Sequence, residues 1–268
     1  MTTEELCTYT VDAGVAVIAF NRPDSMNGMT GNMEVAYFEH LLRAEADDDV
    51  RVVVVTGNGR AFCPGADLAH RPGPQDQPLP NALLERTTPL EISKPMIAAI
   101  NGACAGVGLA YALQCDTRFA VETAKITTAF SRRGLIGEYG MAWLINAIAG
   151  RQVALDLLLS ARVILGSEAA ELGIINGAYK ADELMDHVMA YASDIAANVS
   201  PASMATIKHQ VNTEPAMSAH DALHHAEGVM RESLQGSDVG EGIASFLEKR
   251  AVDFPPLGKG TTFDWMSS

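Results

Sequence analysis

Residues 94–116 read KPMIAAINGACAGVGLAYALQCD, and this stretch decides the fold. The apolar run at 96–100 predicts a buried strand, which Asn101-Gly102 breaks. The glycines that follow predict a tight turn into a helix over 106–113. Because the first N–H groups of a helix have no partner within it, such a turn leaves backbone donors available to a ligand.

A second glycine turn lies about thirty residues earlier. Residues 61–68 read AFCPGADL and follow VRVVVVT at 50–56, a β-branched run typical of a strand buried on both faces. Two such turns on neighbouring strands could direct two N–H donors at one oxygen, which is the geometry of an oxyanion hole. For either turn alone, a tight turn with close packing is the more ordinary explanation, and neither carries a phosphate-binding GxGxxG motif.

The rest of the chain reads as an α/β core followed by helices. Thr30 is expected to cap a helix over 31–46, and strands are predicted at 15–20 and 117–121. We divide the chain into a core over 1–195 and a C-terminal helical region over 196–268, and the proline-rich segment within 71–91 reads as a loop. Helices are predicted at 138–149, 151–160, 167–172, 181–198, 201–212, 216–234 and 238–248, with Ser167, Ser200 and Ser237 as N-caps.

Composition limits the classes of partner. Lys plus Arg is 19 against 33 Asp plus Glu, so the formal net charge of −14 argues against nucleic acid and anionic membranes. No apolar run approaches about 18 residues and no signal peptide is visible, which predicts a cytoplasmic protein without membrane insertion. The cysteines form no metal-ligand pattern and are expected to be small buried hydrophobes: Cys7, Cys63, Cys104 and Cys115.

The two glycine turns, taken together, resemble the crotonase (enoyl-CoA hydratase/isomerase) superfamily. The resemblance runs from about residue 5 to 254 and implies a crotonase-like spiral of ββα repeats. It also implies a helical C-terminal region that builds a homotrimer or, by stacking, a hexamer. Other stretches that carry it are NRPDSMNGM at 21–29, GLIGEYG at 134–140, SARVILGSEAAELGIIN at 160–176 and SFLEKR at 245–250.

The resemblance implies an acyl-CoA thioester substrate, with no metal and no cofactor beyond the coenzyme A of the substrate. In the family two backbone N–H groups bind the thioester oxygen, and they fall here on Ala66 and Val107. The CoA portion is expected to lie against Ser25, Met26, Ala66, Asp67 and Leu68. Arg22 and Lys249 are candidate phosphate partners, although a solvated surface charge is the more ordinary interpretation of each.

The chain departs from the family at the acids. Typical hydratases carry two glutamates, and the matching positions here are Ala110 and Phe130. Glu138 remains, at the point where peroxisomal-type Δ3,Δ2-enoyl-CoA isomerases place their single catalytic glutamate, although the dipole at a helix N-terminus also favours a glutamate there. The favoured reaction is therefore Δ3,Δ2-enoyl-CoA isomerisation through a thioester enolate, with Glu138 as the base. An enoyl-CoA hydratase and a non-catalytic acyl-CoA-binding homologue are the alternatives.

Overall fold

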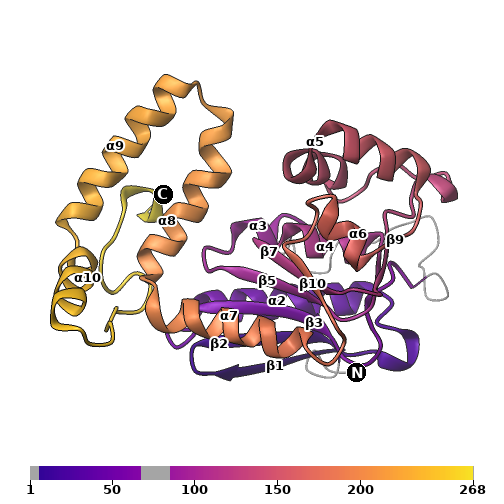
Figure 1. Ribbon diagram of the computed structural model, residues 1–268, viewed down its shortest axis with the longest axis horizontal. Coiled ribbons are helices and arrows are strands. Elements are labelled where there is room, and N and C mark those ends of the chain that lie inside the picture. Colours follow the sequence, from indigo (N-terminus) through magenta and orange to yellow (C-terminus); the bar gives the residue numbers. More distant parts are fainter. Residues whose placement is uncertain (1–5, 68–84, 268) are drawn as a thin grey trace.

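The structure is a computed structural model that describes residues 6–67 and 85–267 (Figure 1). Its core holds a large sheet in the order β1-β2-β3-β5-β7-β10 and a small sheet in the order β4-β6-β8-β9. The large sheet consists of β1 (Cys7–Asp12), β2 (Val15–Phe20), β3 (Val52–Gly57), β5 (Met96–Ile100), β7 (Thr117–Val121) and β10 (Gly177–Tyr179). The small sheet consists of β4 (Ala61–Cys63), β6 (Ala103–Ala105), β8 (Lys125–Thr127) and β9 (Ile164–Leu165).

From β3 to β8 successive strands alternate between the two sheets, and this alternation is the spiral of ββα repeats that was predicted. β5 lies in the large sheet and β6 in the small sheet, and α4 follows them; β7, β8 and α5 repeat the pattern. The helices are α2 (Gly31–Ala46), α3 (Thr88–Glu91), α4 (Val107–Gln114), α5 (Met141–Ser160), α6 (Gly166–Glu171), α7 (Leu184–Asn198), α8 (Pro201–Thr213), α9 (Ala219–Gln235) and α10 (Ser237–Glu248). Short 3-10 turns lie at Pro23–Ser25, Ser131–Arg133, Glu214–Ala216 and Asp264–Ser267.

The four-valine strand β3 forms the centre of the large sheet. It pairs in parallel with β2 on one side and β5 on the other, and all six of its residues are buried. α7 packs against β3, β5 and β7. A strand covered in this way needs apolar side chains on both faces, which explains its unbroken run of valines.

The predicted helices and caps are mostly confirmed. Thr30 caps α2 by accepting a hydrogen bond from the Met33 N–H, and Ser200 caps α8 in the same way. The N-caps predicted at Ser167 and Ser237 are wrong, because both serines lie inside helices whose N-caps are Leu165 and Gly236. The four cysteines are free and buried, as expected, and burial raises the pKa of the Cys63 thiol to about 12.

The C-terminal helices α8, α9 and α10 extend from the end of α7 and stand apart from the core (Figure 1). The division predicted at residue 195 falls in the last turn of α7 and stays a prediction.

One helix, α5, has the length and apolar composition of a membrane span. Its backbone is broken at Gly150, which has φ 79° and ψ 168°, so the helix consists of two shorter pieces. A span needs about 20 continuous residues, and neither piece reaches that length. The sequence predicted two separate helices here, over 138–149 and 151–160. The structure has the same break, and its first piece begins at Met141.

Gly108, in the first turn of α4, allows that helix to touch β4. A Cβ on Gly108 would lie 2.2 Å from the carbonyl oxygen of Cys63. We expect Gly108→Ala to lower the free energy of unfolding by about 1–3 kcal/mol, because the helix must move away from the strand. Gly228→Ala on α9, where nothing lies within 4 Å of the added Cβ, is the matched control and should be neutral or stabilising. Urea denaturation measures both changes, and equal stability of the two variants would contradict the prediction.

Candidate active site

The two glycine turns lie side by side because the strands before them pair. β4 and β6 run parallel, with Cys63 opposite Cys104. Gly65 follows β4 with φ +113° and Gly106 follows β6 with φ +53°, and a Cβ built on Gly106 would lie 3.7 Å from the Gly65 Cα. The sequence had placed these turns directly after the long strands. That expectation is wrong, because a strand of the small sheet lies between each long strand and its turn: β4 before the first turn and β6 before the second. Each of these strands has three residues, which is too short for an alternation of apolar and polar residues to reveal it.

Each turn presents one of the two N–H groups predicted for the site. Val107 is the first residue of α4, and Ala66 lies between Gly65 and Asp67, both of which exchange backbone hydrogen bonds with Met29 (2.9 and 2.8 Å). Across the parts of the chain that the structure describes, neither the Ala66 nor the Val107 N–H donates to a backbone carbonyl. The two groups are therefore available to bind an oxygen atom of a ligand.

The loop at 21–29 packs against the first turn. Arg22 Nη2 lies 2.9 Å from Asp67 Oδ2, and the two side chains are only 13% and 11% exposed. Arg22 Nη1 also donates to the Gly28 carbonyl, so this guanidinium fastens the loop to the turn. The ion pair supports a structural role for Arg22 and Asp67 over a role as free phosphate or adenine partners.

The other residues expected at the CoA portion are distributed unevenly. Ser25 is exposed and Met26 half-buried, on the loop that Arg22 holds beside Asp67. Lys249 is exposed just after α10, in the C-terminal helical region. Leu68 lies outside the described residues. The structure thus brings Ser25, Met26, Ala66 and Asp67 together and leaves Lys249 on a separate element.

Asn27 is a positioning residue that the sequence reasoning missed. It is fully buried, and its Nδ2 donates to the carbonyls of Asn58 (3.0 Å) and Ala61 (2.7 Å). Its Oδ1 accepts from the Arg22 N–H (2.8 Å). One amide therefore joins the 21–29 loop to the start of β4. The sequence signal that could have indicated this role is the pair of asparagines at 21 and 27 in one short loop.

The positions of the two hydratase glutamates are apolar and buried. Ala110 is inaccessible on α4, one turn from Val107, and Phe130 is 7% exposed. The Phe130 ring approaches Gly106, with its Cε1 4.0 Å from a Cβ built there. These two side chains give the surface beside the turns a hydrocarbon character.

Glu138 is half-buried just before α5. The next residue, Tyr139, reaches α4, where its ring centroid lies 5.9 Å from that of Tyr111. Because Tyr111 lies one turn along α4 from Val107, the segment that carries Glu138 approaches the helix that starts at the second turn. Met141, at the start of α5, is buried, whereas Trp143 on the same helix is 64% exposed.

A second carboxylate, Glu34 on α2, lies close to the same helix. Its side chain is 5% exposed, it accepts a hydrogen bond from the Tyr111 hydroxyl, and Arg86 Nε lies 3.4 Å from its Oε1. The Arg86 guanidinium also covers the Tyr139 ring at 4.8 Å from the centroid. Burial, reinforced by Glu34, raises the pKa of Tyr139 to about 12 and that of Tyr111 well above its usual value. Both phenols are therefore neutral hydrogen-bond donors at neutral pH.

The sequence reasoning missed this cluster of Glu34, Arg86, Tyr111 and Tyr139, although one signal was present. Position 34 belongs to the buried face of α2 with Tyr37, Phe38 and Leu41, and a carboxylate on such a face is rare unless it has partners. Metal binding has no comparable support: within residues 6–67 and 85–267, no group of three or more His, Cys, Asp or Glu could hold an ion.

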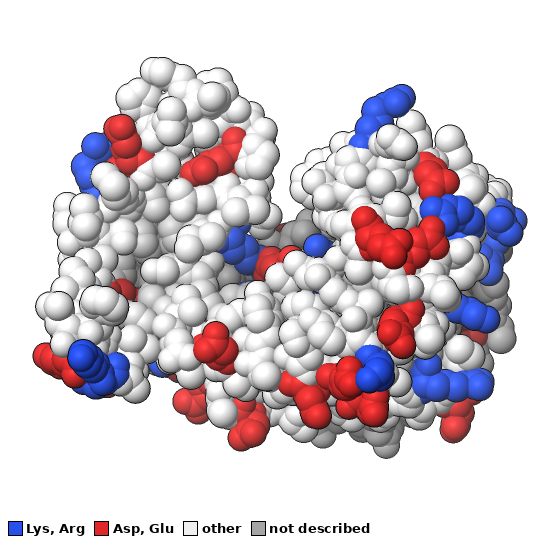
Figure 2. Space-filling model, viewed as in Figure 1, with Lys and Arg blue, Asp and Glu red and all other residues white. Residues whose placement is uncertain are grey.

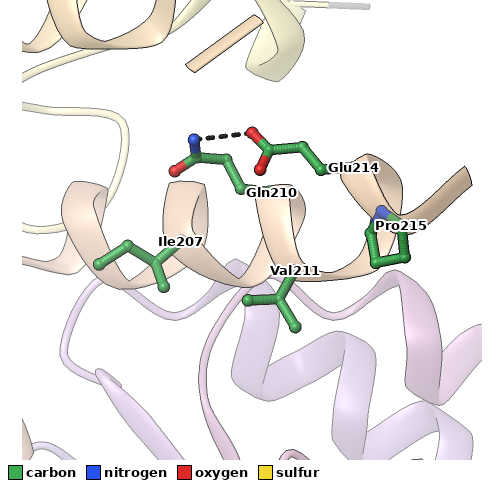
Figure 3. Close-up of a pocket in the computed structure, with 5 residues that line it drawn as sticks. All are labelled: Ile207, Gln210, Val211, Glu214 and Pro215. Atoms are coloured by element: carbon green, nitrogen blue, oxygen red, sulfur yellow. Dashed lines mark hydrogen bonds between the residues drawn. The ribbon is translucent and has the colours of Figure 1, made fainter. Parts of the chain in front are cut away.

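The described part of the surface is hollowed beside the C-terminal helices. Figure 2 shows a deep notch between the C-terminal helices and the lobe that carries α5, with side chains of both charges at its floor. An open hollow of about 400 Å³ lies on α8 (Figure 3). It is lined by Ile207, Gln210, Val211, Glu214 and Pro215, none of which was predicted for the site.

The chain is similar to known proteins over nearly its whole length. The enoyl-CoA hydratase/isomerase family model matches residues 10–256. A 1,2-epoxyphenylacetyl-CoA isomerase of Escherichia coli K12 is 32% identical over 254 residues, with 91% of this chain and 96% of the relative covered. An (E)-benzylidenesuccinyl-CoA hydratase of Thauera aromatica is 33% identical, with 92% and 98% covered.

Solved structures agree with this assignment. The crystal structure of an enoyl-CoA hydratase from Bacillus anthracis superposes with a TM-score of 0.87 at 26% identity, covering 93% of this chain and 99% of the other. The alternating ββα repeats, the paired glycine turns and the family match lead to one conclusion: this chain belongs to the enoyl-CoA hydratase/isomerase family of the crotonase superfamily.

Proposed function

We propose that this chain is a cytoplasmic Δ3,Δ2-enoyl-CoA isomerase in which Glu138 is the base. The thioester oxygen accepts hydrogen bonds from the Ala66 and Val107 N–H groups. Glu138 removes a proton from C2 of a 3-enoyl-CoA, and the electron pair moves into the thioester to give a dienolate. The same carboxyl group then returns the proton at C4, which leaves the double bond between C2 and C3.

The backbone donors stabilise the dienolate because its oxygen gains negative charge during the reaction. One preorganised donor of this kind contributes about 3 kcal/mol in the transition state. Val107 begins α4, so the positive end of the helix dipole acts on the same oxygen.

The observation that carries the proposal is the distribution of acids around the turns. Ala110 and Phe130 are buried and apolar, whereas Glu138 is half-buried on a segment that approaches α4. Within the described residues Glu138 takes part in no ion pair, so its carboxylate is free to accept a proton. Isomerisation needs one such group, because a single carboxylate can serve C2 and C4 in turn.

Hydration is the second candidate, and several relatives carry that name. It needs one group to activate water and another to protonate the α-carbon, and the two family positions for those groups are apolar here. A non-catalytic acyl-CoA-binding protein would keep the backbone donors and lack turnover altogether.

A pair of absorbance assays separates the three functions. Conjugated-enoyl absorbance should rise when the wild-type chain receives a 3-enoyl-CoA, and it should change much more slowly with a 2-enoyl-CoA. Faster loss of absorbance with the 2-enoyl-CoA would indicate a hydratase. Tight binding of both without change would indicate a binding protein.

Glu138→Gln tests the base directly. The amide keeps the shape of the side chain and cannot accept the proton, so we expect the isomerase kcat to fall by roughly a hundredfold to ten-thousandfold. Acyl-CoA affinity and melting temperature should stay the same. Glu171→Gln, an exposed glutamate on α6, is the matched control and should keep the wild-type rate. If Glu138→Gln retains most of its activity, the base lies elsewhere.

Gly65→Val tests the first N–H donor. Gly65 has φ +113°, and a Cβ there would lie 3.3 Å from the Ala105 carbonyl oxygen, so valine must distort the turn that presents Ala66. Turnover should fall by about a hundredfold or more, the loss typical of one oxyanion donor. Gly173→Val, at φ +73° with nothing within 4 Å, imposes similar backbone strain away from the turns. The two variants should lose similar stability, and normal turnover in folded Gly65→Val would show that this turn does not hold the oxygen.

We also propose that the chain assembles as a trimer or hexamer. Large apolar side chains are exposed on α8 and on other helices. On α8, Ile207 and Val211 line the hollow of Figure 3. Exposed apolar surfaces of this kind mark contacts between proteins. Those on the other helices include Trp143, Leu159, Leu223, Met230, Leu234, Phe246 and Leu247.

Light scattering at micromolar concentration measures the assembly. The expected mass is three or six times that of the 28.5 kDa chain. A monomer under these conditions would contradict the proposed assembly.

A further inference from the structure

Two helices start at the paired glycine turns and meet one turn later. α2 begins directly after Met29 and its cap Thr30, and Met29 bridges Ala66; α4 begins at Val107. Glu34 lies in the first turn of α2 and Tyr111 lies one turn along α4 from Val107, and the Tyr111 hydroxyl donates a hydrogen bond to Glu34. One turn of helix rises about 5.4 Å. The pair therefore lies about one turn beyond the two N–H donors, where an acyl group that runs along α4 from the thioester would end.

The hydrogen bonds of Glu34 are concentrated on one of its two oxygens. Tyr111 and Arg86 both donate to Oε1, and within the described residues no partner is recorded for Oε2. A carboxylate oxygen is a strong acceptor of hydrogen bonds, so Oε2 can accept one from a ligand. Arg86 lies beside it, uses Nε for Glu34 and also contacts Tyr139, and its side chain is 55% exposed, so part of the guanidinium is accessible to a ligand.

We propose that Glu34 and Arg86 form a polar end to the acyl pocket that selects acyl-CoA substrates bearing a hydroxyl group on the acyl portion. The inference rests on the proposed function in one respect, since it takes the thioester to lie at Ala66 and Val107. A hydroxyl donates to Glu34 Oε2 and accepts from Arg86, so it satisfies both groups at once. A carboxylate on the acyl group would be repelled by the negative charge of Glu34, and an ammonium group would be repelled by the positive charge of Arg86.

The surroundings of this pair favour an aromatic acyl group. Tyr111 and Tyr139 lie edge to face, and the Phe130 ring lies beside Gly106 at the second turn. Rings prefer such edge and offset contacts with one another. A phenylacetyl group carrying a hydroxyl on the ring combines this apolar body with the polar tip that Glu34 and Arg86 would bind.

A purely structural role for Glu34 makes a different prediction. An acid in the first turn of a helix is favoured by the helix dipole, and its bonds to Tyr111 and Arg86 join α2, α4 and the segment before α3. If that were its whole role, changing Glu34 would alter stability, or the affinity for every acyl-CoA by the same factor. A recognition role changes the ratio of affinities between ligands with and without the hydroxyl.

The experiment measures that ratio by titration calorimetry with probes that the proposed reaction cannot turn over. Phenylacetyl-CoA is compared with its 2-, 3- and 4-hydroxy derivatives on the full-length wild-type chain. At least one hydroxy derivative should bind about tenfold more tightly than phenylacetyl-CoA, the gain of one hydrogen bond to a charged group. Glu34→Gln should bring the ratio close to one and leave the affinity for phenylacetyl-CoA unchanged. Glu39→Gln, on the exposed face of the same helix, is the matched control and should keep the ratio.

A second variant covers the case in which Glu34→Gln does not fold. Arg86→Gln changes a half-exposed side chain, and it should also lower the ratio. The inference is overturned if no hydroxy derivative binds more tightly, if Glu34→Gln weakens all ligands equally, or if 4-carboxyphenylacetyl-CoA binds better than the hydroxy compounds. Failure of every probe to bind would overturn the acyl-CoA site as a whole. Loss of the Glu138 effect with the hydroxyl preference intact would overturn only the proposed reaction.

Discussion

The site depends on a close backbone contact between α4 and β4. At Gly108 the helix comes so near to Cys63 that no side chain fits between them, and the parallel pairing of β4 with β6 holds Gly65 beside Gly106. Two N–H groups on separate repeats of the spiral can serve one oxygen only if the strands that carry them are adjacent. The small sheet therefore has a role beyond its size, since its three-residue strands set the distance between the donors.

A second layer of contacts fixes the direction of the helices that leave this point. Asn27 ties the 21–29 loop to β4, and the ion pair of Arg22 with Asp67 ties the same loop to the first turn. Because Met29 is bound to that turn by two hydrogen bonds, α2 starts at a defined place beside it. Glu34 then meets α4 at Tyr111 as a consequence of where both helices begin. The position of the Glu34 carboxylate is therefore set by where α2 begins, and its own hydrogen bonds add to that.

The sequence predicted the main parts of this arrangement and missed those with no local pattern. The long strands, the capped helix α2 and the two glycine turns follow from runs of apolar residues and from glycine spacing, which are local signals. The strands β4 and β6 have three residues each, which is too short for a repeating pattern of apolar residues to reveal them. The turns were therefore predicted to follow β3 and β5 directly, whereas they follow β4 and β6. The cluster around Glu34 joins residues more than fifty positions apart, and only folding brings them together.

The charges around the turns fall into two groups with different uses. Glu34 is matched by Arg86, and the buried phenols of Tyr111 and Tyr139 stay neutral, so this end of the site adds no net charge. In the proposed reaction, a dienolate at the two N–H groups would therefore meet little net repulsion from Glu34, because Arg86 balances the charge of that carboxylate. Glu138 has no such cationic partner among the described residues, and in the proposed reaction its carboxylate takes the proton. In the proposed reaction the total negative charge therefore stays the same as the proton passes from C2 to the carboxylate, and the buried, apolar Ala110 and Phe130 add no charge of their own.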